Sequence, residues 1–327
     1  MSWTIRRYTQ GDKMSWDAFI DGARNATFLF RRDYIDYHAN RFTDCSLMAF
    51  RNGKLAAVLP ANIQDDTLYS HQGLTYGGWC LHSHPVDGAD YWDLWMSWLD
   101  WCHGQKIQTI IYKPLPSIYH LIPSQEDIYM LSKTGQIMES NLSSAIDLTM
   151  NPGFNKLQKR HLLHAPSDLS IKFFNGLLKT EVENFHRMLT ECLESRHGAT
   201  PVHTLDELQL LMDRFPENIM IWTAGRDDAM EAGVCAFYTP RCMHCQYIAT
   251  TPSGREDNIL PALFNRMIEW ATEYQWRYFD FGISNERDGD LNYGLNRQKT
   301  SFGGTGVVYS KWSISVFSAA RGLLSEL

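Results

Sequence analysis

The chain has 327 residues, of which 44% are hydrophobic and 20% are charged, and its formal net charge is −7. This length exceeds one average domain, so we expect two lobes with enough apolar residues for a core in each. Proteins that hold nucleic acid mainly through its phosphates need a basic surface, so the net charge argues against DNA and disfavours tRNA as a partner.

The patterning of the first half predicts a lobe rich in strands. In chain order, its predicted elements are a strand at 3–8, a helix between 13 and 40 that is broken near 25–27, strands at 46–51, 54–60, 65–70 and 74–79, a helix at 89–103 and a strand at 109–113. Asn52-Gly53 separates the strands at 46–51 and 54–60, and this dipeptide readily adopts the positive φ angles of a tight hairpin turn.

The second half has a similar order of elements. They are helices at 180–196 and 204–214, strands at 219–224, 231–238 and 244–250, a helix at 259–274 and a strand at 278–282. When the second half is laid over the first without gaps, Trp95–Trp101 lies over Phe264–Trp270 and Thr109–Tyr112 lies over Tyr278–Phe281. Because hairpin, strand, loop, helix and strand occur twice in one order, we predict a duplicated fold.

A boundary between the halves is predicted near residue 150. The segment 114–124 contains three prolines, and Asn151-Pro152-Gly153 is typical of a turn. We therefore expect an N-terminal lobe over 1–150 and a C-terminal lobe over 151–327, with a helix at 156–164 that bridges them.

Cysteine usage and the N-terminus indicate the compartment. The seven cysteines are odd in number, and a chain of this size does not need disulfides, so we expect reduced thiols. Met1–Arg7 lacks the apolar stretch of a signal peptide, and no apolar run reaches the length of a transmembrane helix. We expect a soluble cytoplasmic protein without a membrane span.

The repeated order of elements resembles the core of the GNAT superfamily of acyltransferases, an α/β fold with mixed sheets. In that fold the loop before the helix faces the pyrophosphate of an acyl-CoA, because a helix N-terminus gathers unpaired N–H donors and a positive dipole. The corresponding loop here is Thr250–Asn258. The resemblance implies acyl-CoA as the donor, bound by Thr250, Thr251, Gly254, Arg255 and Asn258.

Within that superfamily, the chain is most similar to the FemAB-like branch. Its loop has one glycine where the usual pattern is Gln/Arg-x-x-Gly-x-Gly/Ala, a departure typical of FemAB-like transferases, which fuse two GNAT-like lobes and can use aminoacyl-tRNA as donor. Tyr278–Ser284 resembles the strand that follows the helix in this branch, and Gly294–Gly304 resembles its C-terminal Lys-x-x-Phe-Gly segment. The resemblance therefore implies tandem GNAT-like lobes, with the donor site in the C-terminal one.

Two charged residues are the first catalytic candidates. Asp280 stands in a strand of aromatic residues, where a buried carboxylate needs a partner. It is either a general base that deprotonates an amine or an anchor for Lys299 or Arg287. By resemblance, Lys299 lies near the cleft and holds an anionic group as a compact charge, and the alternative is a solvated lysine at a helix end.

Tyrosines supply the remaining candidates. Tyr238 ends a predicted strand, and a tyrosine near the leaving thiolate is the general acid in many GNAT enzymes; core packing is its alternative role. We expect Tyr293, Arg287 and Tyr76 to contact substrate, the last from a glycine-rich run in the first lobe.

No metal site is predicted. Cys242-Met243-His244-Cys245 has two potential sulfur ligands, but structural zinc usually needs a second such pair, and the sequence contains none.

Three functions remain open at this point. The first is an acyltransferase that moves an acyl group from acyl-CoA to an amine acceptor, a small molecule or a peptide, in a cleft between the lobes. The second is FemAB-like aminoacyl transfer from aminoacyl-tRNA to a cell-wall or related precursor. The third is a non-catalytic ligand-binding protein with a decayed donor loop. For the first two we expect an opening in the sheet between the strand that ends at Thr250 and the strand that begins at Tyr278.

Overall fold

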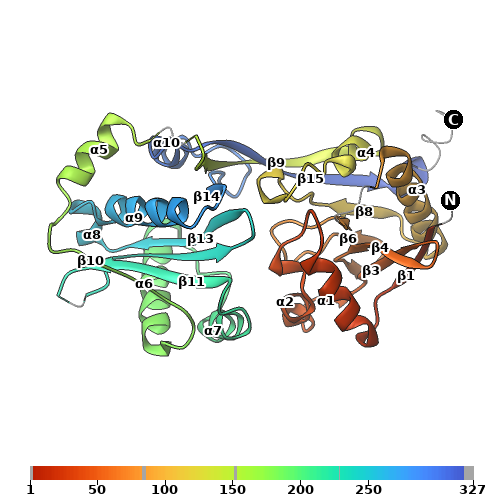
Figure 1. Cartoon of the computed structure of the whole chain (residues 1–327), viewed down its shortest axis with the longest axis horizontal. Helices are drawn as coiled ribbons and strands as arrows, with labels where there is room; N and C mark the ends of the chain where they lie inside the picture. Colours follow the sequence, from red (N-terminus) through yellow and green to blue (C-terminus); the bar gives the residue numbers. More distant parts are fainter. Residues whose placement is uncertain (1–2, 83–85, 151–152, 228, 320–327) are drawn as a thin grey trace. The chain divides into compact units, whose positions relative to one another are not determined.

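The computed structural model describes residues 3–82, 86–150, 153–227 and 229–319 (Figure 1). The chain forms two compact units, called here the first unit (Met1–Asn141 with Val308–Leu327) and the second unit (Leu142–Val307). The chain passes from one unit to the other within β9 (Gly135–Asp147) and β15 (Thr305–Ser315).

These units differ from the predicted lobes of 1–150 and 151–327. The first unit takes back the end of the chain, because β15 returns to pair with a strand of that unit. The predicted bridging helix, α5 (Lys156–Leu163), lies within the second unit and packs against another helix there, so it does not bridge the units. The predicted turn at Asn151-Pro152 falls outside the described residues.

The other elements of the first unit are β1 (Trp3–Arg7), α1 (Lys13–Asp21), α2 (Arg32–Ile35), β2 (Thr43–Asp44), β3 (Leu47–Arg51), β4 (Lys54–Leu59), β5 (Asn62–Gln64), β6 (Thr67–Tyr69), β7 (Cys80–Leu81), α3 (Gly88–Gly104), β8 (Thr109–Tyr112) and α4 (Glu126–Thr134). Short 3-10 turns lie at Gln10–Asp12, Phe28–Phe30, Asp36–His38 and Ser117–Tyr119.

Strand pairing in the first unit confirms the predicted hairpin. β3 and β4 are antiparallel around Asn52 (φ 50°) and Gly53 (φ 77°), in a sheet with the order β1-β3-β4-β7. Neighbouring strands β5 and β6 form a second hairpin. β6 also pairs in parallel with β8, and α3 lies in the chain segment that connects these two strands. Aromatic side chains of α3 fill the core between these elements, including Trp95 and Trp98, both 0% exposed.

The predicted strand at 74–79 is wrong. That segment is a tightly packed loop in which a Cβ atom on Gly77 would lie 2.2 Å from the main-chain oxygen of Ser70. Gly78 has φ +96°, a conformation that suits glycine and not an extended strand. The apolar residues of the loop are buried, and the loop pairs with the chain after β8 through an isolated bridge between Gly77 and Pro114 instead of forming a strand.

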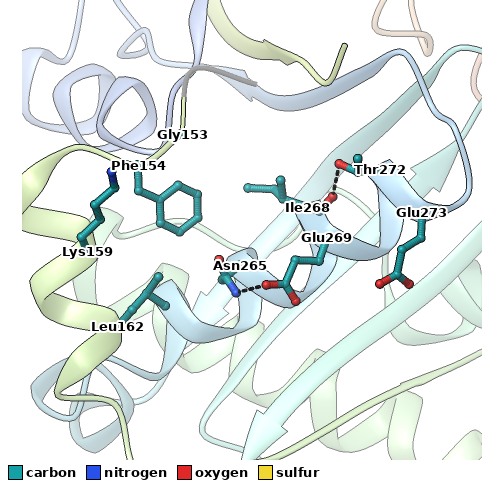
Figure 2. Close-up of a pocket in the computed structure, with 9 residues that line it drawn as sticks. All are labelled: Gly153, Phe154, Lys159, Leu162, Asn265, Ile268, Glu269, Thr272 and Glu273. Carbon is teal, nitrogen blue, oxygen red and sulfur yellow. Dashed lines mark hydrogen bonds between the residues drawn. The ribbon is translucent and has the colours of Figure 1, made fainter. Parts of the chain in front are cut away.

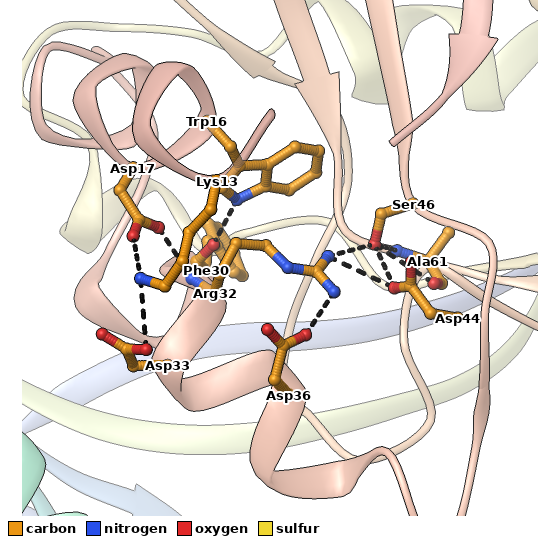
Figure 3. Close-up of polar contacts among 10 residues, drawn as sticks. All are labelled: Lys13, Trp16, Asp17, Phe30, Arg32, Asp33, Asp36, Asp44, Ser46 and Ala61. Carbon is orange, nitrogen blue, oxygen red and sulfur yellow. Dashed lines mark hydrogen bonds and ion pairs between the residues drawn. The ribbon is translucent and has the colours of Figure 1, made fainter. Parts of the chain in front are cut away.

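A buried arginine stabilises the N-terminal part of the first unit (Figure 3). Arg32 is 2% exposed, and its guanidinium donates to Ser46 Oγ at 3.0 Å, to Asp44 Oδ1 at 3.2 Å and to Asp36. The guanidinium also lies over the ring of Tyr8, 3.9 Å from its centroid. Because three segments of the chain meet at this one side chain, it fixes their mutual arrangement.

A carboxyl group is also buried in the first unit, on α4. Asp127 accepts hydrogen bonds from the hydroxyl of Tyr112 at 3.2 Å and from the main-chain nitrogen of Ile128 at 2.8 Å. Burial disfavours the charged form and raises the pKa of the Asp127 carboxyl to about 7.

This carboxyl is expected to make stability fall as the pH rises between about 4 and about 7. In this window the native state keeps a proton that the unfolded chain has lost, so the free energy of unfolding drops by up to about 1.4 kcal/mol per pH unit. Urea unfolding of wild type and Asp127→Asn at about pH 5 and about pH 8 measures this loss of stability. The stability of the variant relative to wild type should be about 2 kcal/mol greater at the higher pH. An equal difference at both values would contradict the raised pKa.

Besides α5, the second unit contains β10 (Ser170–Phe174), α6 (Lys179–His197), α7 (Leu205–Arg214), β11 (Ile219–Gly225), β12 (Ala232–Tyr238), β13 (Cys242–Thr250), α8 (Pro252–Glu256), α9 (Ile259–Glu273), β14 (Tyr278–Ile283) and α10 (Tyr293–Ser301). Its strands have the order β10-β11-β12-β13-β14-β9, in which β14 is parallel to β13 and the other pairs are antiparallel.

Helices cover both faces of this sheet (Figure 1). α9 packs on one face, where Leu263, Phe264 and Met267 meet side chains of β12, β13 and β14. α6 lies on the other face, with Phe185 against Gly233 of β12. Side chains of β14 therefore alternate between the two faces, Phe279 and Phe281 toward α9 and Asp280 away from it.

Each unit contains a parallel strand pair, and the second strands of the two pairs are the segments that the ungapped overlay of the two halves aligns. β8 pairs with β6 from Thr109 onward, and β14 pairs with β13 from Tyr278 onward. In both units a helix lies between the two parallel strands along the chain, α3 in the first unit and α9 in the second.

Candidate active site

The candidate site lies where β13 and β14 part in the second unit. Their paired residues are Cys242 with Tyr278, Met243 with Phe279 and His244 with Asp280, and β13 then continues to Thr250 without β14. This is the position at which we expected the sheet to open.

Both strands bend at the same level. The bulge on β13 is visible in its pairing with β12, where Cys235 pairs with Tyr247 and the next residue, Ala236, pairs with Cys245. Gln246 of β13 is therefore the extra residue of the bulge. On β14, the register with β9 shifts between Asp280 and Ile283, where Gly282 has φ +78°. A bulge on one strand and a left-handed glycine on the other are the local causes of the opening.

Asp280 is at the centre of this opening and is 0% exposed. Its Oδ1 atom accepts hydrogen bonds from Ser143 Oγ at 2.5 Å and from the main-chain nitrogen of Gly282 at 3.0 Å. Its Oδ2 atom lies 2.9 Å from Nδ1 of His244. These partners offset the cost of burying a carboxylate, and they come from β9, β13 and β14.

Lys299 reaches the same point from α10, whose first turn is capped by the side chain of Asn292. Lys299 is 6% exposed, and its Nζ atom donates to the main-chain oxygens of Gly282 at 2.8 Å and Ile283 at 2.5 Å. Burial lowers the pKa of the Lys299 ammonium to about 8, against the opposing attraction of Asp280 and Cys245. We call Asp280, His244, Ser143 and Lys299 the polar centre.

The first unit has apolar or aromatic residues at the matching positions. In its parallel pair, the third pair of residues is Tyr69 with Ile111, where the second unit has His244 with Asp280. The duplicated fold therefore carries an acid–imidazole pair at this register in the second unit and not in the first.

The predicted donor loop is folded onto itself. Thr251 caps the short helix α8 by accepting a hydrogen bond from Gly254 N at 3.0 Å, and the N–H groups of Arg255, Asp257 and Asn258 also donate within the loop. A Cβ atom on Gly254 would lie 2.4 Å from the main-chain oxygen of Glu231, so this glycine serves close packing.

The side chains of this loop also have partners inside the protein. Arg255 donates to the main-chain oxygen of Thr250 at 2.9 Å, and Thr250 Oγ1 donates to Glu231 O at 3.1 Å. Asp257 forms an ion pair with Arg226 at 2.6 Å. Asn258 has φ +57° and directly precedes α9.

The structure places the tyrosine and arginine candidates in three different environments. Tyr238 is 3% exposed in the aromatic core on the α9 face, where its hydroxyl accepts from Trp222 Nε1 at 2.6 Å and burial raises its pKa. Tyr293 and Arg287 are exposed, in α10 and in the loop before it. Tyr76 belongs to the first unit, buried among aromatic rings that include Phe30 and Tyr119.

Two members of the polar centre, His244 and Ser143, were not among the sequence candidates. His244 was considered only as part of the Cys242–Cys245 segment. The signal that would have found it is the one that pointed to Asp280: a polar side chain within a strand of apolar residues. Ser143 had no such signal, because β9 itself was not predicted.

A separate groove of about 460 Å³ lies between α5 and α9 (Figure 2). Its apolar lining includes Phe154, Leu162 and Ile268, and its polar lining includes Lys159, Glu269 and Glu273. No residue of the polar centre lines this groove.

Two further properties follow from the described residues. Among them, no helix is long and apolar enough to span a membrane. In the same part of the chain, no three or more His, Cys, Asp or Glu side chains are grouped so as to hold a metal ion.

Comparisons with known proteins agree with the fold. Residues 158–293 match the acetyltransferase (GNAT) domain family. FemX has a similar structure, with TM-score 0.68 and 10% identity over 95% of this chain and 96% of that chain. L-PGS from Bacillus licheniformis has TM-score 0.58 and 9% identity, over 97% of each chain.

A tandem GNAT protein from the clavulanic acid biosynthesis pathway has TM-score 0.55 and 10% identity, over 96% of this chain and 99% of that chain. No curated protein matches the sequence. Residues 158–293 thus match the acetyltransferase (GNAT) domain family, and the chain as a whole has the mixed α/β fold of tandem GNAT proteins.

Proposed function

We propose that the second unit transfers an acyl group from an activated donor directly to an amine, at the opening between β13 and β14. The observation that carries this proposal is that the two parallel strands stop pairing at the residues that hold a buried Asp–His pair. An extended donor can lie along the unpaired stretch of β13, with its carbonyl carbon beside the polar centre. Holding donor and amine together supplies much of the rate, because reaction then needs no further loss of translational freedom.

Lys299 has two roles in this proposal. Its hydrogen bonds to Gly282 O and Ile283 O fix the bend of β14, and its charge, about 3 Å from those oxygens, favours a nearby oxyanion. Because burial brings its pKa to about 8, the ammonium is largely charged at neutral pH.

Acyl-CoA is the donor that the GNAT domain favours, with Thr250–Asn258 at its pyrophosphate. An aminoacyl ester, as in FemAB-like enzymes, is the second candidate donor. The observation that favours it is the set of loop N–H groups that already donate within the loop, which leaves fewer of them for a pyrophosphate. The net charge of −7 supports a donor other than a whole tRNA.

Ligand-induced stabilisation tests the proposal. Acetyl-CoA, longer acyl-CoAs and free CoA are added to the protein in thermal unfolding experiments, and release of thiol is followed with a panel of primary amines. A bound donor at a hundredfold excess over its dissociation constant adds about 2.7 kcal/mol to the free energy of unfolding. Stabilisation with thiol release supports acyl-CoA. If no CoA derivative stabilises the protein but an aminoacyl ester is consumed in the presence of an amine, the second donor is favoured. No transfer from either donor class would refute the proposed function.

A further inference from the structure

The Asp–His pair of the polar centre contains a candidate proton acceptor for the proposed reaction. We infer that His244 takes the proton from the attacking amine and that Asp280 is a positioning residue that orients the imidazole. This inference rests on the proposed acyl transfer and names the residue that performs its proton step.

Burial separates the roles of the two side chains. The Asp280 side chain is 0% exposed, and its two oxygens are engaged by Ser143, Gly282 N and His244. The His244 side chain is 13% exposed. A group that receives a proton from a substrate must approach it, so the imidazole is the member of the pair that can do so.

Hydrogen-bond chemistry sets the tautomer of the imidazole. An ionised carboxylate only accepts hydrogen bonds, so His244 Nδ1, 2.9 Å from Asp280 Oδ2, carries the hydrogen. In the neutral ring the basic nitrogen is then Nε2. Asp280 thus directs the basic nitrogen of His244 and also stabilises the imidazolium that forms.

The position of His244 fits this role. It is the last residue of β13 that pairs with β14, directly before the strands part. Its ring lies beside Gly282, where an added Cβ atom would be 3.5 Å from His244 Cε1. The left-handed glycine that bends β14 thereby also leaves space next to the imidazole.

Groups from four elements lie near His244 or near its partner Asp280. They are Asp280 of β14, Ser143 of β9, Cys245 of β13 and Lys299 of α10, which interacts electrostatically with Asp280. The carboxylate of Asp280 and the ammonium of Lys299 therefore both contribute charge in this region.

The proposed step balances without another reactant. The amine nitrogen attacks the donor carbonyl, the C–N bond forms, and the C–S bond of a thioester (or C–O bond of an ester) breaks. The ammonium form of the amine first gives one proton to His244 Nε2, which frees the nitrogen lone pair for attack. After the attack, the nitrogen gives a second proton to the leaving thiolate or alkoxide, which departs as the thiol or alcohol. The imidazolium then releases its proton to solvent, so the Asp–His pair returns to its starting state, and nothing is oxidised or reduced.

The test compares two acceptors in wild type and His244→Asn. The Asn side chain keeps an N–H donor where Nδ1 stands, so the contact to Asp280 is retained while the base is removed. One acceptor is a primary alkyl amine, which is protonated at neutral pH. The other is hydroxylamine, which is unprotonated and attacks thioesters without a base. We expect kcat/KM for the alkyl amine to fall 100-fold or more and that for hydroxylamine to fall less than about fivefold.

The matched control is His186→Gln, since His186 of α6 is a partly buried histidine whose Nε2 contacts the main-chain oxygen of His203 at 3.0 Å. It should keep wild-type activity with both acceptors. His244→Gln is the second variant, should His244→Asn unfold at lower urea concentration than wild type.

The outcomes separate the inference from the function on which it rests. Equal losses with both acceptors, or an alkyl-amine rate above one third of wild type in a folded variant, would overturn the role of His244 and leave acyl transfer standing. A wild-type protein that transfers to neither acceptor from any donor would refute the proposed function, and the role of His244 with it.

Discussion

Asp280→Asn is expected to lower kcat for acyl transfer by 100-fold or more, equivalent to about 2.7 kcal/mol, while the protein stays folded. The amide oxygen can still accept from Ser143 and from Gly282 N, but an NH₂ group then faces His244 Nδ1. The imidazole must accept from that group, so its hydrogen moves to Nε2 and the base is lost. Steady-state kinetics, with a donor and an amine that the wild-type protein uses, measure the loss of kcat, and urea unfolding measures whether the variant stays folded.

Asp147→Asn is the matched control for this variant. Asp147 lies on β9, pairs in the sheet with Tyr278, and binds Arg277 at 2.8 Å with 26% of its side chain exposed. It is a carboxylate in the same sheet but outside the polar centre, so its variant should keep kcat within about twofold. If both variants kept full activity, Asp280 would be a structural residue only, and the polar centre would not be the active site.

Arg32→Ala is expected to lower the free energy of unfolding by about 3 kcal/mol. The change removes a buried guanidinium with partners on three segments, among them Asp44 and Ser46, and leaves a cavity under the ring of Tyr8. The two carboxylate partners, Asp36 and Asp44, are 31% and 35% exposed, so water can rehydrate them and the loss stays below that of a fully buried pair. Equilibrium unfolding in urea at neutral pH measures this effect.

Arg6→Ala provides the comparison for a similar ion pair at the surface. Arg6 makes two hydrogen bonds to Asp12, at 2.8 and 2.7 Å, but 43% of its side chain is exposed. Its removal should cost less than about 1 kcal/mol, and added salt should reduce the cost further. Equal losses in the two variants would show that burial is not what makes Arg32 important.

Local sequence signals predicted the elements whose residues carry their own pattern. Asn52-Gly53 marked the β3–β4 hairpin because few dipeptides adopt two positive φ angles, and the apolar periodicity of 259–274 marked α9. The ungapped overlay of the two halves indicated the duplication, and the structure shows that the aligned segments are the second strands of matching parallel pairs. A local signal also predicted one residue of the site, because Asp280 is a lone carboxylate in a strand of aromatic residues.

Long-range pairing decided what the sequence did not reveal. β9 is rich in polar residues and has no regular alternation, and its residues Ser143–Asp147 pair with β14, which is distant along the chain. Ser143 reaches Asp280 only through that pairing, and Lys299 reaches the carbonyls of Gly282 and Ile283 only through the placement of α10. The role of Asp280 as general base was a reasonable sequence hypothesis, but which member of an acid–imidazole pair can meet a substrate depends on burial.

The sequence by itself determined the class of fold, the repeat and the strand that carries the key carboxylate, since these depend on periodicity, turn residues and order along the chain. Only the tertiary structure decided that His244 stands beside Asp280, that the loop at 250–258 uses its own N–H groups, and that 74–79 packs as a loop. The physical reason is that hydrogen bonding and exposure are properties of neighbours in space, and four segments of the chain supply the neighbours of this one carboxylate.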